Sequence, residues 1–132
     1  MKTIQIPTKA RTQMVNITSR VQDEVRASDF ADGLCCVVVP HTTAGVFINE
    51  GADPSVMEDL ENTLERMVPW NDSYSHMEGN AAAHVKATFV GESVTVIVEN
   101  GRLQLGQWQA IFFAEFDGPR RRHAWVKLVP GS

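Results

Sequence analysis

The sequence predicts an α+β fold, in which two or three helices cover a mostly antiparallel sheet in one domain spanning residues 1–132. Three observations predict it. Apolar and β-branched runs typical of strands recur along the chain, a few segments have helical apolar spacing, and the two kinds do not alternate regularly. A doubly wound parallel sheet needs more crossover helices and is disfavoured. With 132 residues, of which 43% are apolar, the chain can bury a core without disulfides.

The N-terminal segment predicts two strands followed by a helix. Apolar residues alternate with polar ones on both sides of Pro7, so two strands are expected between residues 2 and 17, and they could pair as a hairpin. Thr18 or Ser19 can cap a helix from about residue 19 to 30.

Two strands follow on either side of a short polar connection. The apolar run 34–39 predicts a strand buried on both faces and ended by Pro40. Segment 44–50 predicts the next strand. The connection His41-Thr42-Thr43 therefore lies at a strand end, where side chains are accessible for chemistry.

Two helices are expected in the middle of the chain. Asp53 and Pro54 are favourable N-terminal residues for a helix from 54 to about 68, which carries one apolar stripe. After a polar loop, Asn80 can cap a short helix from 81 to about 90. The rest is β-rich, with strands at 94–99, 103–116 (interrupted near Gly106) and 124–129, and turns at Asn100-Gly101 and Gly118-Pro119.

Charge and composition exclude several classes of function. The net charge of −4 disfavours binding to DNA or RNA backbones. We expect no membrane association, because no apolar stretch approaches the ~20 residues of a spanning helix. The adjacent Cys35 and Cys36 cannot join distant segments and are expected to pack in the core as unreactive thiols, which favours a cytoplasmic location.

Three histidines at element boundaries are candidate metal ligands. His41, His76 and His84 could converge, and three neutral imidazoles bind Zn²⁺ while leaving a coordination position open. Their spacing matches no local metal motif, so the alternative of scattered, hydrogen-bonded histidines stays open. His123 is interpreted as a surface residue.

Polar residues near these histidines are candidates for supporting chemistry. Glu78 and Asn80 could orient an imidazole or act as a general base, and Asn49 and Glu50 are further candidates. Each of the four could instead be a cap or a surface residue.

A basic run near the C-terminus is a candidate phosphate site. Strand alternation places Arg120 and Arg122 on one face, where guanidinium groups could bind phosphate oxygens. The alternative is a solvated turn or an ion pair with Asp117.

A series of short motifs resembles one family. They are His41-Thr-Thr-Ala-Gly45, Ile48-Asn-Glu50, Asp53-Pro54, His76-Met-Glu-Gly-Asn80, Ala83-His84, Gly106-Gln-Trp-Gln109 and Asp117-Gly-Pro-Arg120. In this order, over about residues 3–129, they closely resemble the YjbQ family, also called the secondary thiamine-phosphate synthase enzyme family. One departure is Gln107, where the family signature has threonine.

The resemblance implies a homotrimer with a histidine metal site and weak thiamine-phosphate synthase activity, which joins a pyrimidine diphosphate to a thiazole phosphate. Zinc is the expected metal and Mg²⁺ the alternative, since imidazoles favour zinc whereas diphosphate chemistry favours Mg²⁺ held by carboxylates. The implied metal ligands are His41, His76 and His84; the catalytic candidates are Glu78, Asn80 and Glu50; and the substrate-binding candidates are Arg120, Arg122, Asn49, Trp108 and Gln109.

Two hypotheses about function follow. The first is a metal-dependent enzyme acting on a small phosphorylated or otherwise anionic substrate. The second is a trimeric protein that binds a metal or small ligand without turnover.

Overall fold

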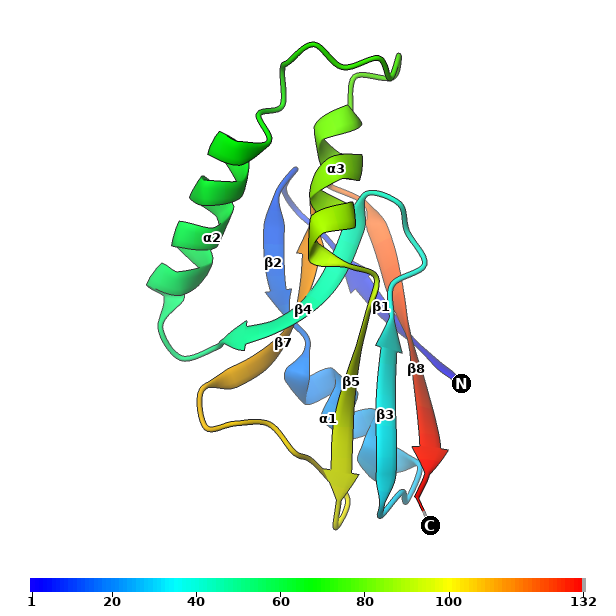
Figure 1. Cartoon of the computed structure of the whole chain (residues 1–132). Coiled ribbons are helices and arrows are strands. Elements are labelled where there is room, and N and C mark those ends of the chain that lie inside the picture. The colour runs from blue at the N-terminus through cyan, green and yellow to red at the C-terminus, as the bar shows by residue number, and fades with distance from the viewer. Residues whose placement is uncertain (132) are drawn as a thin grey trace.

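The computed structural model describes residues 1–131 and confirms an α+β fold in a single domain with three helices. All paired strands are antiparallel and form two sheets (Figure 1). The elements are β1 (Lys2–Pro7), β2 (Gln13–Asn16), α1 (Thr18–Ala27), β3 (Gly33–Val38), β4 (Ala44–Glu50), α2 (Pro54–Met67), α3 (Ala81–Val90), β5 (Ser93–Glu99), β6 (Arg102–Leu103), β7 (Gln109–Glu115) and β8 (Arg121–Pro130).

The core lies between the two sheets. The larger sheet has the order β1-β8-β3-β5-β6 and the smaller has the order β2-β7-β4. Helix α1 contributes the fully buried Val21 and Val25 to the core, beside Val37 of the larger sheet and Phe113 of the smaller. Within residues 1–131, no helix is long and apolar enough to cross a membrane.

The expected N-terminal hairpin is wrong. Strand β1 pairs with β8 and β2 pairs with β7, so these neighbours in sequence belong to different sheets. Strand β1 gains more burial from its distant partner than a two-stranded hairpin provides, as the complete burial of Ile6 shows.

Helix α1 is shorter than predicted, and its N-terminal hydrogen bonds differ from those expected. The Asn16 side chain, rather than Thr18 or Ser19, accepts the backbone N–H of Thr18 at 3.1 Å. The helix ends at Ala27, and Asp29 takes the left-handed conformation at φ 52°. This reversal places Phe30 outside the helix.

Strand β3 is buried on one face only, contrary to the sequence prediction. Cys35 and Val37 are fully buried, whereas Leu34 is 41% exposed, because in the described chain the outer face of the larger sheet is open. Core packing is therefore confirmed for Cys35, and burial raises its thiol pKa to about 11. It is wrong for the half-buried Cys36.

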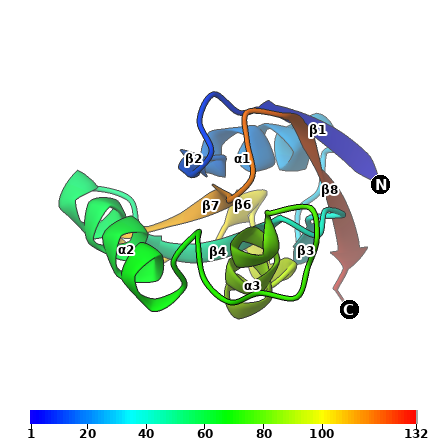
Figure 2. The same ribbon diagram turned by 90° about the horizontal axis from the view of Figure 1, so that it is seen from above.

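The helices α2 and α3 are confirmed and cover the outer face of the smaller sheet (Figure 2). Asp53 caps α2 by accepting the backbone N–H of Ser55 at 2.9 Å. The two helices are joined by Lys86 Nζ, which lies 2.6 Å from Glu65 Oε2. Asn80 precedes α3 but makes no capping hydrogen bond, contrary to expectation.

The interrupted segment 103–116 is two strands in two sheets. Strand β6 pairs with β5 in the larger sheet, and β7 lies at the centre of the smaller one. The turn at Gly106 therefore carries the chain between sheets.

A buried ion pair connects the two sheets. Arg122 of β8 donates from Nε to Glu115 Oε1 of β7 at 2.9 Å, and from Nη2 to the same carboxylate and to Thr43 Oγ1. Glu115 also accepts the Thr8 hydroxyl at 2.7 Å and the backbone N–H groups of Phe116 and Asp117. The Glu115–Arg122 pair thus fixes the ends of three strands, and its guanidinium also holds the loop after β3.

The Glu115 carboxylate stays ionised despite its burial. Burial alone would raise its pKa, but hydrogen bonds from Arg122, Thr8 and the Asp117 N–H outweigh this effect and hold the pKa of Glu115 below its usual value. A depressed carboxyl pKa stabilises the fold at pH values above the unfolded pKa.

Gly45 allows the end of α3 to approach β4. The Val46 N–H donates to Gly91 O at 3.0 Å, and a Cβ at Gly45 would lie 2.5 Å from that same oxygen. We expect Gly45→Ala to displace the end of α3 and destabilise the protein by about 1–3 kcal/mol in urea unfolding. Gly106→Ala is the control, because its Cβ would meet only the flexible Gln109 side chain at 3.2 Å. Equal stability of the two variants would contradict the proposed steric role.

We expect Glu115→Gln to lower the free energy of unfolding at pH 7 by about 3–5 kcal/mol, because Arg122 keeps a buried charge without its counterion. The wild-type pair contributes fully above the unfolded pKa of about 4.3, and this contribution is lost as the pH falls through the lower folded pKa. The stability gap between wild type and variant should therefore narrow on acidification, as measured by urea unfolding at several pH values. The exposed Glu58→Gln serves as control, and a gap that does not change with pH would refute the assignment.

Candidate functional site

A polar cavity of about 360 Å³ lies where the loop after β3 meets the N-terminal part of α3. Its lining residues are Pro40, His41, Thr42, Thr43, Glu78, Asn80, His84, Asp117, Arg120 and Arg122. A second cavity of about 370 Å³ shares His41, Thr42 and His84 with it. The two form one continuous candidate site. In Figure 1 this region is at the upper end of β3.

His41 is held in the neutral form. Its Nε2 accepts the backbone N–H of His123 at 3.1 Å. Burial, followed by the positive charge of Arg122, lowers the pKa of His41 below its usual value near 6.5. A neutral imidazole whose Nε2 is an acceptor carries its proton on Nδ1, so Nδ1–H is a hydrogen-bond donor at this site.

His123 is a site residue that the sequence interpretation missed. Its ring packs edge-on against His41 with the centroids 4.7 Å apart, and it is half-buried rather than a surface residue. Position 123 carries no local signal for this contact. The contact arises because β8 pairs with β3 and brings His123 beside the loop that follows β3.

The opposite wall comes from α3 and the loop before it. Glu78 and Asn80, which the sequence analysis names as candidates beside the histidines, both line the cavity. Asn80 Nδ2 donates to Asp117 Oδ2 at 2.9 Å, which explains why Asn80 does not cap α3. Its Oδ1 is buried and, within residues 1–131, has no hydrogen-bond partner. It can therefore accept a hydrogen bond from a water molecule or a ligand.

The two arginines of the basic run have different environments. Arg120 precedes β8, is 52% exposed at its side chain, and donates from Nη2 to Asp117 Oδ2 at 2.9 Å. This is the ion pair that the sequence left as an alternative. Arg122 also lines the cavity, but its side chain is 6% exposed and its charge is compensated by Glu115. Arg120 is thus the more accessible cation of the site.

Four predicted site residues lie elsewhere, at the far end of the smaller sheet. Glu50 pairs with Gln109, next to Asn49 and the 58% exposed Trp108. The side chains of Asn49 and Glu50 accept backbone N–H groups of their own loop at 2.7 and 2.9 Å. At about 3.4 Å per residue, the length of β4 separates this group from the His41 loop by roughly 20 Å.

The three predicted metal ligands approach one another without forming a ligand set. The rings of His76 and His84 have centroids 5.0 Å apart, and His84 shares both cavities with His41. His41 Nε2 is already an acceptor for His123. Among residues 1–131, no three His, Cys, Asp or Glu side chains are arranged to hold a metal ion. The assignment of His41, His76 and His84 as metal ligands stays a prediction.

The site as a whole combines hydrogen-bond donors, acceptors and one accessible cation. His41 Nδ1–H and Arg120 can donate to an anion. Glu78 and Asn80 supply acceptor oxygens on the opposite wall. Such a set can bind a small anionic molecule that also carries hydrogen-bond donors.

Comparison with known proteins finds relatives described as UPF0047 proteins. It is 49% identical over 125 residues to a UPF0047 protein of Methanocaldococcus jannaschii, covering 95% of this chain and 91% of the relative. It is 47% identical over 130 residues to the UPF0047 protein YugU of Bacillus subtilis, covering 98% of both.

Solved structures agree with these sequence relatives. A YjbQ/UPF0047 family protein from Clostridium acetobutylicum superposes with a TM-score of 0.96 at 44% identity, covering 98% of this chain and 100% of that one. A hypothetical protein from Aeropyrum pernix gives a TM-score of 0.94 at 35% identity, covering 98% of each chain. Residues 2–131 match the family described as "UPF0047 protein YjbQ-like". The chain therefore belongs to the YjbQ/UPF0047 family.

Proposed function

We propose that the His41–His84 cavity binds a small phosphorylated substrate and that the chain is an enzyme with weak thiamine-phosphate synthase activity. The observation that carries the proposal is the placement of Arg120 and the neutral His41 in one cavity with Glu78 and Asn80. Cationic and N–H donors stabilise phosphate oxygens, and the acceptor oxygens can orient the rest of the substrate.

In this reaction the methylene carbon of a pyrimidine diphosphate forms a bond to the thiazole nitrogen as its bond to the diphosphate oxygen breaks. Negative charge develops on the departing pyrophosphate, with no proton needed by the attacking nitrogen. Arg120 and His41 Nδ1–H are the groups suited to stabilise that charge. The exposed side of Arg120 is available because Asp117 takes only part of its donor set.

We expect Arg120→Ala to weaken binding of thiamine phosphate and pyrophosphate in calorimetric titrations. Loss of a charge-assisted contact costs on the order of 1.5–3 kcal/mol, or roughly tenfold to a hundredfold in affinity. Arg120→Lys should restore only part, because lysine keeps the charge without the planar fork. His84→Ala should reduce thiamine-phosphate formation. Arg66→Ala, on the exposed side of α2, is the control, and equal affinity in all variants would leave Arg120 as a solvated turn residue.

The second candidate is a trimeric protein that binds a metal without turnover. The proximity of the His76 and His84 rings favours a metal site at these residues. We propose zinc, with Mg²⁺ as the alternative, once His76 and His41 reorient. Elemental analysis of protein purified without chelator or metal-binding tag should then find one divalent metal per chain. His41→Ala, His76→Ala and His84→Ala should each lose most of it while keeping native circular dichroism. Undiminished metal in the triple variant would show that other groups bind it.

Self-association completes the proposal. The outer face of the larger sheet exposes Leu34, Ile97 and Val129, at 41%, 55% and 41%, which favours burial against another copy of the chain. A second copy could bring Trp108 and Gln109 to a neighbouring His41 cavity, which would unite the two groups of predicted site residues. A cytoplasmic location, consistent with the free Cys35 and Cys36, belongs to the same proposal.

Light scattering should give about three times the chain mass of 14.6 kDa. Leu34→Glu or Ile97→Glu should shift the protein toward a monomer, because a buried interface disfavours an unpaired charge. Glu58→Lys, on the exposed face of α2, is the matched control. If wild type remains a monomer at high concentration, the homotrimer is wrong.

A further inference from the structure

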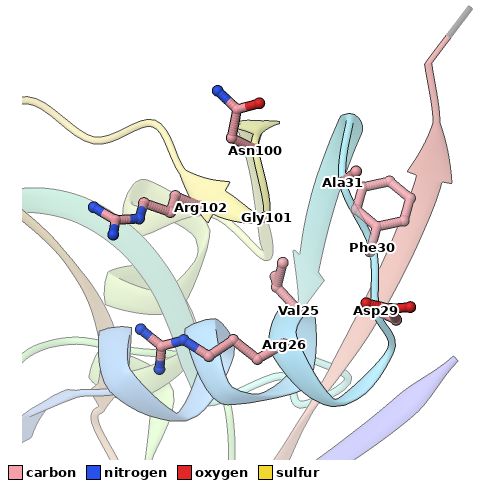
Figure 3. A pocket seen from close by; sticks show the side chains of 8 residues that line it. All are labelled: Val25, Arg26, Asp29, Phe30, Ala31, Asn100, Gly101 and Arg102. Atoms are coloured by element: carbon pink, nitrogen blue, oxygen red, sulfur yellow. The ribbon is translucent and has the colours of Figure 1, made fainter.

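A separate cavity, of about 380 Å³, lies at the opposite end of β3 from the His41 site. It is formed where the C-terminal turn of α1 faces the turn between β5 and β6 (Figure 3). Arg26 on α1 and Arg102 on β6 line it from two different elements. No predicted site residue lies in it.

Both guanidinium groups are available to a ligand. Within residues 1–131, the Arg102 side chain has no hydrogen-bond or ion-pair partner. Arg26 has one contact, 3.4 Å from Asp23, and both of those side chains are about two-thirds exposed. Such an exposed pair contributes little energy and is readily exchanged for a better acceptor.

The two guanidinium groups project to the same side of the cavity. Figure 3 shows them one above the other, with the Asn100 amide on the same wall as Arg102. Asp29, the carboxylate of this cavity, lies at its other end beside Phe30. Two acidic residues accompany the arginines: Asp23 lies 3.4 Å from Arg26, and Glu99 stands opposite Arg102 in the strand register without an ion pair to it in the described chain.

The backbone on which these groups stand is fixed by hydrogen bonds. Gln22 of α1 donates from Nε2 to Gly101 O at 2.9 Å and accepts the Leu103 N–H at 3.0 Å. The Gly101 N–H donates to Ala31 O at 3.0 Å. These contacts fix α1 and the β5–β6 turn relative to each other. Ligand binding therefore loses less conformational entropy than it would at a mobile backbone.

A neighbouring cavity of about 430 Å³ shares Arg26 with the Arg26–Arg102 cavity. Leu103 and Leu105 form its apolar wall and Ser19 supplies a hydroxyl. A ligand with an anionic head at the two arginines can therefore extend an apolar group along α1.

We propose that the Arg26–Arg102 cavity is a second ligand site, which takes a small organic phosphate monoester. Two guanidinium groups from different elements match a phosphate dianion, whose oxygens each group can engage with paired N–H donors. The organic part lies against Leu103 and Leu105. This site is independent of the one proposed at His41, from which β3 separates it.

The test is an NMR titration of the full chain with phenyl phosphate, following backbone amide signals. We expect saturable shifts at Gly101 and Arg102. Arg26→Gln and Arg102→Gln should each weaken the affinity derived from these signals roughly tenfold, and the double variant should abolish the shifts. Arg66→Gln is the matched control, since it removes the same charge from an exposed helix outside the cavity.

The readout separates this site from the first. Arg120→Ala should leave the Gly101 and Arg102 shifts unchanged, whereas signals near Gly118 report the His41 cavity. The proposal is overturned if phenyl phosphate at millimolar concentration shifts only the Gly118 region, or shifts nothing. It is equally overturned if the double variant binds as wild type does while its circular dichroism stays native.

Discussion

The buried ion pair between Glu115 and Arg122 is the interaction on which the candidate site depends. It joins β7 of the smaller sheet to β8 of the larger one, and through Thr8 and Thr43 it also holds the end of β1 and the loop that carries His41. A buried charge pair is tolerated only when its remaining donors and acceptors are satisfied. Here the backbone N–H groups of Phe116 and Asp117 donate to the Glu115 carboxylate and satisfy its further acceptor capacity.

The same pair sets the electrostatics of the cavity above it. Because Arg122 and Glu115 neutralise each other, the accessible positive charge of the His41 cavity belongs to Arg120. Burial and the nearby Arg122 keep His41 neutral, so it meets a ligand as a donor from Nδ1 rather than as a cation. Asp117 links these parts, since it receives hydrogen bonds from both Arg120 and Asn80.

The two-sheet architecture separates site residues that the sequence predicted to act together. Residues before and after β4 lie at opposite ends of that strand, which divides the predicted site into a histidine group and a Trp108 group. The outer face of the larger sheet is uncovered in the described chain and exposes Leu34, Ile97 and Val129 among polar residues.

The sequence by itself determined the elements whose signals are local. Asp53 and Pro54 start α2 because capping and a fixed proline φ act within one helical turn. Helix α3 is confirmed, and the motifs around His41 and His84 indicate the YjbQ family that the comparisons establish.

Only the tertiary structure decided which distant strands pair and which polar groups meet. The sequence could not show that β1 pairs with β8 rather than with β2, because strand pairing depends on the apolar surface buried across the whole core. The sequence also could not show that Arg122 is buried against Glu115, that Asn80 binds Asp117, or that His123 contacts His41. Each of these contacts joins segments that strand register and sheet closure bring together. Local sequence patterns determine the helix or strand to which a residue belongs, whereas the packing of the complete chain determines which residues it contacts.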